Sequence, residues 1–133
     1  MRSPSLRRVQ IHRLDETESF TTLDGSQIRE LAGPSSGSAL NQSLAEATVA
    51  PGEATDEHYH EVTEEIYFFT HGKGRMRLGE EEHEVGPGDA VVIAAGVKHK
   101  IWASEDEPLR LLCCCAPAYS HEDTVITEWA ATP

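Results

Sequence analysis

The chain from residue 39 to residue 116 is a run of short apolar segments, interrupted at regular intervals by glycine and proline. Segments with the composition of β-strands lie at residues 39–49, 55–60, 65–71, 74–78, 82–85, 90–94, 99–103 and 108–116. Turn-forming stretches such as Pro51-Gly52 and Gly86-Pro87-Gly88 separate them, at the spacing of roughly 8 to 12 residues that is typical of all-β sandwiches and barrels. The sequence therefore predicts an all-β fold with little room for helices.

The length of 133 residues favours a single domain, which at this size buries about 70% of the surface of the unfolded chain. We expect an N-terminal extension at residues 1–26, a barrel at residues 27–124 that opens with a strand at 27–31, and a C-terminal tail at residues 125–133. Residues 1–8 are expected to be loose. Ser120 favours a short C-terminal turn or helix through residues 121–124.

The charge balance limits the kinds of partner. The chain carries 23 acidic and 11 basic residues, a formal net charge of −12. Such a charge opposes binding to nucleic acid and to anionic lipid surfaces. The first thirty residues contain no long apolar stretch, as a signal peptide or membrane helix would require. We therefore expect a cytoplasmic protein that binds a small molecule, with neither nucleic acid nor membrane as a partner.

Three histidines and one carboxylate fall at positions where strand parity can bring them together. His58 and His60 are two residues apart, so in a strand both imidazoles leave the same face. Glu65 opens a later strand and shares its face with apolar residues, where an isolated charge is costly unless a cation or a donor compensates it. His99 opens a further strand and shares a face with Ile101.

These residues resemble the motifs of a known family. The pattern Gly52-x5-His58-x-His60-x4-Glu65-x6-Gly72 is similar to the first motif of the cupin superfamily in every defining position. The resemblance runs from about residue 39 to residue 116 and implies a double-stranded β-helix, the cupin or jelly-roll barrel. It points to the small single-domain bacterial cupins.

The second cupin motif is matched by Gly88-x5-Ala94-x-Gly96-x2-His99. Ala94 stands where the family usually has proline, and Ala103 stands where it usually has asparagine. The first change should loosen a turn, and the second removes a polar group that is not a metal ligand in the family. Neither departure removes a ligand.

The resemblance implies that His58, His60, Glu65 and His99 bind one divalent metal ion per subunit. Glu64 is an alternative to Glu65, which we favour because it lies seven residues before the glycine that ends the first motif. Three imidazoles and one carboxylate suit Fe, Mn, Ni, Co or Zn and leave coordination positions for water or substrate. The alternative is a metal-free barrel that keeps these histidines as hydrogen-bonded core groups.

Side chains on the inner faces of the predicted strands are candidates for a substrate pocket. They are Gln42, Tyr67, Phe69, Met76 and Ile101. The apolar members of this set could instead simply fill a small barrel. Tyr67 and His71 are the nearest candidates for catalysis, and His83, within an acidic hairpin, is expected to be solvated.

A metal-dependent enzyme acting on a small organic substrate, of dioxygenase or isomerase type, is the function that this pattern favours. The alternatives are a metal-bearing binding or sensor module without turnover, and a structural barrel that keeps the motif. The resemblance also implies a homodimer, and Ile66, Phe68 and Trp102, on faces opposite the predicted ligands, need a cover. The run Cys113-Cys114-Cys115 is interpreted as small buried hydrophobic residues, with a redox role as the alternative.

Overall fold

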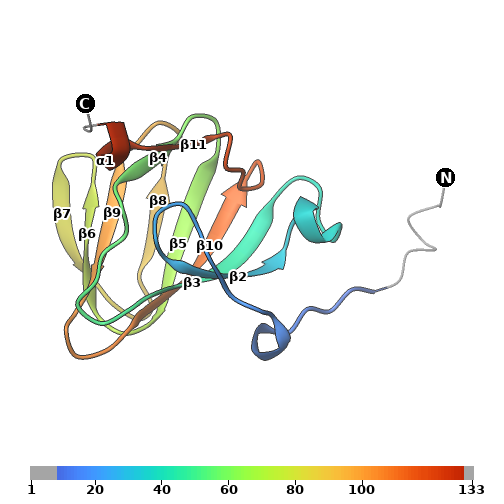
Figure 1. Ribbon diagram of the computed structural model, residues 1–133, viewed down its shortest axis with the longest axis horizontal. Helices are drawn as coiled ribbons and strands as arrows, with labels where there is room; N and C mark the ends of the chain where they lie inside the picture. The colour runs from blue at the N-terminus through green and yellow to red at the C-terminus, as the bar shows by residue number, and fades with distance from the viewer. Residues whose placement is uncertain (1–8, 131–133) are drawn as a thin grey trace.

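The computed structural model describes residues 9–130 and consists of two antiparallel sheets that face each other (Figure 1). The first sheet contains, in spatial order, β1 (Phe20–Thr21), β2 (Gln27–Ala32), β3 (Ser43–Val49), β10 (Leu109–Ala116), β5 (Glu64–His71) and β8 (Ala90–Ile93). The second contains β11 (Thr124–Ile126), β4 (His58–His60), β9 (His99–Ala103), β6 (Gly74–Leu78) and β7 (Glu81–Val85). This architecture confirms the predicted all-β, double-stranded β-helix fold.

Helical structure in the described part of the chain is confined to short pieces. They are the 3-10 turns η2 (Leu14–Glu16) and η3 (Pro34–Ser36) and the single-turn helix α1 (Thr127–Ala130). The short turn predicted after Ser120 is present, because the backbone amide of Asp123 donates to Ser120 Oγ and that of Thr124 donates to the carbonyl oxygen of His121; helix α1 follows it. None of the helices in residues 9–130 is long and apolar enough to cross a membrane.

Strand β5 shows why the sequence pattern places the two faces of the barrel correctly. Glu65, Tyr67 and Phe69 are buried, whereas Ile66 and Phe68 alternate with them and are exposed. The buried set packs against β10, the centre of the first sheet, which pairs with both β3 and β5. Fully buried side chains between the two sheets form the core: Phe69, Ile93, Ile101, Leu109 and Leu111.

Both ends of the described chain take part in the sheets. Strand β1 pairs with β2 beside it, and β11 pairs with β4 and buries Ile126. The boundaries expected at residues 26 and 124 therefore do not coincide with the edges of the sheets, because short strands on both sides of them are hydrogen-bonded into the barrel. Residues 1–8 and 131–133, the outer parts of the expected extension and tail, lie outside the described residues.

Trp102 lies half-buried on the outer face of the second sheet. Three cationic groups surround its ring, with Arg75 at 4.5 Å from the ring centroid and Arg77 and Lys100 each at 5.4 Å. Cation–π contacts of this kind cover an aromatic ring without excluding water from it. Within one chain, then, Trp102 is covered by cations and not enclosed between the two sheets.

Candidate metal centre

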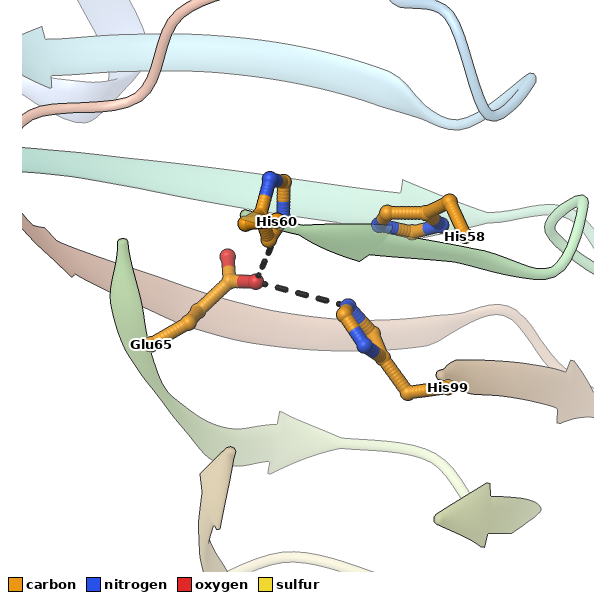
Figure 2. Close-up of side chains that lie close together, drawn as sticks. All are labelled: His58, His60, Glu65 and His99. Carbon is orange, nitrogen blue, oxygen red and sulfur yellow. Dashed lines mark ion pairs between the residues drawn. The ribbon is translucent and has the colours of Figure 1, made fainter. Parts of the chain in front are cut away.

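Four buried side chains from three strands meet between the sheets (Figure 2). His58 and His60 come from β4 and His99 from the neighbouring β9, while Glu65 reaches across from β5 of the facing sheet. One possible ligand atom from each residue lies within 4.8 Å of the others. Glu65 Oε1 is 3.1 Å from His60 Nε2 and 3.5 Å from His99 Nε2.

Strand parity and register explain this convergence. His58 and His60 are both buried and Tyr59 between them is half-buried, as the two-residue period of a strand requires. In the pairing of β4 with β9, His58 lies directly opposite His99, so their rings come within 4.2 Å. Glu64, the alternative carboxylate, is exposed on the outer face of β5 and lies outside the group.

Hydrogen bonds at the Nδ1 atoms, which point away from the ligand group, fix the orientation of the three imidazoles. His58 Nδ1 donates to the carbonyl oxygen of Asp56 at 2.9 Å, and His99 Nδ1 donates to that of Val97 at 2.9 Å. A carbonyl accepts only, so both rings carry the proton on Nδ1. When such a ring is neutral, the lone pair of Nε2 therefore points into the site.

His60 reaches the same state through a hydroxyl group. Its Nδ1 lies 3.1 Å from Thr124 Oγ1, and this hydroxyl donates its hydrogen to the carbonyl oxygen of Ser120 at 2.8 Å. The Thr124 oxygen must then accept from Nδ1 of His60. Outer partners of this kind orient the imidazoles that bind metal ions in proteins.

The inner atoms of the site lack partners among the described residues. Glu65 Oε1 and His99 Nε2 are buried without a hydrogen bond. Three Nε2 atoms and a carboxylate oxygen converge on one point, an arrangement that needs positive charge between the atoms, either protons on the imidazoles or a metal ion. The donor set, its outer hydrogen bonds and its unpaired inner atoms therefore fit a divalent metal ion.

The pKa shifts favour the protonation states that bind a metal. Burial, followed by the repulsion of the neighbouring His99, lowers the pKa of His58 to about 4, so this ring is neutral at pH 7. Burial alone would raise the pKa of Glu65, but the imidazoles of His60 and His99 outweigh it and lower this pKa to about 2. The side chains therefore offer a neutral imidazole and a carboxylate without releasing protons at neutral pH.

A cavity of about 70 Å³ adjoins the ligand group on the side of β2 and β3. Its walls are mostly apolar. The lining residues outside the ligand group include Phe20, Thr22, Asp24, Ser26, Ile28, Glu30, Ser43, Ala45, Thr55, Tyr67, Ile101, Cys113, Cys115, Tyr119 and Thr124. The volume suffices for a few water molecules or a very small organic ligand.

Only part of the predicted pocket lies at this cavity. Tyr67 and Ile101 line it, whereas Phe69 is fully buried in the core. Met76 is buried beside a second hollow, formed by β6, β7 and β8. His71 is exposed at the end of β5 and lies 3.7 Å from Glu107, away from the ligand group.

The expectation for Gln42 is wrong. The side chain is exposed just before β3 and does not line the cavity. Residues Ser43, Ala45 and Ala47 line it instead, so the inward face of this strand has the opposite parity from Gln42.

Several polar residues of the cavity were not identified from the sequence, among them Asp24, Tyr119, Cys113 and Cys115. Asp24 belongs to the segment expected to lie outside the barrel, and Tyr119 follows the last predicted strand. The two thiols share a strand face, and their alternation along β10 was the available signal. Cys115 Sγ donates to Glu65 Oε2 at 3.3 Å, which places one member of the cysteine run against the ligand group.

The interpretation of the cysteines as buried hydrophobic residues holds for part of the run. Cys115 is buried and Cys113 half-buried, but Cys114 between them is exposed on the outer face of β10. Burial, followed by the charge of Glu65, raises the pKa of Cys113 and of Cys115. Both inward groups are therefore thiols at neutral pH, the less reactive form.

Comparison with known proteins agrees with this arrangement. A family model described as "Cupin domain" matches residues 45–115. The uncharacterized protein MJ1618 of Methanocaldococcus jannaschii is 46% identical over 114 residues, which cover 86% of this chain and 91% of MJ1618. Protein SchB of Streptomyces halstedii is 30% identical over 112 residues, which cover 80% of this chain and 81% of SchB.

Solved structures share the fold at much lower identity. Pac13 of Streptomyces, a nucleoside dehydratase, superimposes with a TM-score of 0.72 and 16% identity, over 89% of this chain and 90% of Pac13. Likeness at this identity concerns the fold alone. The match to the family model over more than half of the chain, together with the 46% identity to MJ1618, shows that the protein belongs to the cupin domain family.

Proposed function

We propose that this protein is a metal-dependent enzyme acting on a small organic substrate, with a reaction of dioxygenase or isomerase type. The observation that carries the proposal is the set of converging, unpaired ligand atoms beside a cavity: Glu65 Oε1 and His99 Nε2 have no hydrogen bond among the described residues. In a group of residues that only stabilises the fold, such buried polar atoms would be hydrogen-bonded to other residues. The enzymatic name of Pac13, a fold relative, supports catalysis in a barrel of this size.

A divalent ion held by His58, His60, Glu65 and His99 would supply Lewis-acid polarisation of a substrate oxygen. Around it, the chain's own residues do the rest. The outer hydrogen bonds at Asp56, Val97 and Thr124 hold the imidazoles in place. Tyr67 and Ile101 contribute to the mostly apolar wall of the cavity, and a wall of low dielectric constant strengthens charge interactions beside it.

A binding or sensor module without turnover is the second candidate. The observation that favours it is the small volume of the cavity, about 70 Å³, which holds a ligand of only a few atoms in this conformation. Neither weak catalytic candidate supplies an acid or base at the cavity: His71 is remote, and burial raises the pKa of Tyr67 well above its usual value. Turnover would then depend on the ion and on groups not predicted from the sequence.

Turnover experiments separate the two candidates. We expect protein loaded anaerobically with Fe(II) or Mn(II) to convert at least one compound in a panel of small hydroxy and carbonyl metabolites, assayed by oxygen consumption and by NMR. Removal of the metal with a chelator should abolish the activity, and reloading should restore it. Binding without conversion for every member of the panel would favour the sensor module over the enzyme.

We also propose that the subunit forms a homodimer through the outer face of β5 and β8. Ile66, Phe68 and Val92 are 39%, 41% and 60% exposed there and form an adjoining apolar set, since Ile66 pairs directly with Val92. Burying such side chains is favourable by about 25 cal/mol for each Å² of apolar surface. Light scattering should give twice the subunit mass, and Phe68→Glu should shift it to one subunit; a monomeric wild type would contradict the proposal.

A further inference from the structure

The wall of the cavity beside the ligand group carries a second carboxylate, which the motif does not contain. Asp24 lies in the turn between β1 and β2, and its Oδ2 is 3.9 Å from Nε2 of His58. The side chain is only 12% exposed. Its place is fixed from two sides: Oδ1 accepts from the backbone and hydroxyl of Ser26, and the backbone oxygen accepts from the amide of Asp56.

These bonds leave Oδ2 as the free acceptor atom of Asp24. This oxygen lies 3.9 Å from His58 Nε2, and both residues line the cavity. A molecule in the cavity beside His58 therefore meets it. An acceptor in a mostly apolar cavity needs a donor from its ligand, since a buried carboxylate oxygen without one is costly. A hydroxyl group supplies such a donor.

The charges of the whole lining point the same way. Asp24, Glu30 and Glu65 contribute three carboxylates, whereas no lysine or arginine of residues 9–130 lines the cavity. A divalent ion would offset only two of these charges. The phenol of Tyr119 also lines the cavity and is neutral, because burial raises its pKa. Its hydroxyl lies 3.4 Å from Thr22 Oγ1 and 3.0 Å from His121 Nδ1.

We propose that this cavity selects small, uncharged, hydroxyl-bearing molecules over anions, and that Asp24 is the residue that sets this preference. The inference rests on the proposed function, because it concerns the ligand class of the same site. A phosphate or carboxylate ligand would meet two carboxylates beyond the ligand group and, apart from the ion itself, no cationic side chain of the lining to pair with. An uncharged ligand avoids this repulsion and can donate its hydroxyl hydrogen to Asp24.

A pair of matched probes tests the proposal. Hydroxyacetone and glycolate have equal numbers of heavy atoms, and at neutral pH only glycolate is charged. Protein loaded with Co(II) reports the binding of either through its visible absorption spectrum. We expect the wild type to bind hydroxyacetone at least tenfold more tightly than glycolate, and Asp24→Asn to reduce this ratio by about tenfold or more, because a nearby unit charge is removed.

Two further variants make the result specific. Glu30→Gln, on the cavity wall, should shift the ratio in the same direction as Asp24→Asn, whereas Glu80→Gln changes the net charge equally on an exposed hairpin and should leave the ratio unchanged. Circular dichroism establishes that each variant is folded. The inference is overturned if cobalt binds and the wild type takes glycolate as tightly as hydroxyacetone, or binds neither, or if Asp24→Asn leaves the ratio unchanged. Failure of cobalt itself to bind would overturn the proposed function first.

Discussion

Alanine at His60 is expected to lower the affinity of the protein for a divalent metal ion by about hundredfold or more. The substitution removes one of four converging ligand atoms and leaves Glu65 Oε1 without its nearest neighbour, at 3.1 Å. Loss of an outer partner of a ligand typically costs about 10- to 100-fold in affinity, so loss of the ligand itself should cost at least as much. Competition with a chromophoric chelator measures the affinity.

An intermediate variant and a control variant test whether this loss of metal affinity is specific. Thr124→Val keeps the size of the side chain but removes the acceptor for Nδ1 of His60, so we expect an intermediate loss of about 10- to 100-fold. His83→Ala removes an exposed histidine of β7 whose nearest charged neighbour is Glu81, and it should leave the affinity unchanged. Equal losses in His60→Ala and His83→Ala would refute the assignment of the ligands.

Alanine at Gly72 is expected to lower the free energy of unfolding by about 3 to 5 kcal/mol, the sum of backbone strain and steric overlap. Gly72 has φ +81°, a region that residues with a Cβ rarely adopt. A Cβ at this position would overlap the carbonyl oxygen of Pro108 and come within 3.2 Å of Leu109 Cα, both in the backbone. Because backbone cannot rotate aside, the strands must separate. Denaturant titration measures the loss.

Gly79 provides the matched control. Its φ is +61°, but a Cβ added at this position would have no heavy atom within 4 Å, so Gly79→Ala should cost only about 1 to 2 kcal/mol of conformational strain. The difference between the two variants isolates the close approach of the β5 end to β10. If both variants lose the same free energy, the steric part of the argument is wrong.

The ligand group could be predicted because its residues match the cupin motifs, and strand parity agrees with that match. The pair His58 and His60 needs only the two-residue period of a strand, and the burial of Glu65 follows from the alternation along β5. The same reasoning assigned Ile66 and Phe68 to the outer face, where they are exposed. Glycine and proline turns marked the strands well enough to predict an all-β fold, and the resemblance to the cupin motifs predicted the double-stranded β-helix.

The cavity could not be predicted to the same extent, because its wall is built by contacts that are distant in sequence. Asp24 reaches the site only because its turn is hydrogen-bonded to Asp56 and β2 pairs with β3. Gln42 was misassigned because alternation gives the two faces of a strand but not which one points inward. On β3 the inward residues are Ser43 and Ala45, whose small side chains leave the cavity open.

Met76 shows a related limit. Its burial follows from the alternation along β6, yet it lies by a different hollow from the ligand group. A barrel has a long interior, and parity does not give the depth at which a side chain lies along it. Depth depends on the register between strands, which follows from the pairing of β6 with β9 and β7 and not from the sequence of β6 alone.

The most direct test of the account is the metal content of the protein, purified without a chelating tag and measured by elemental analysis beside His99→Ala. We predict about one equivalent of a divalent transition metal per subunit in the wild type, and little or none in the variant, because His99 Nε2 is one of the unpaired atoms that the ion would satisfy. Wild-type protein that holds no metal after anaerobic loading with Fe, Mn, Co, Ni and Zn in turn would contradict the account.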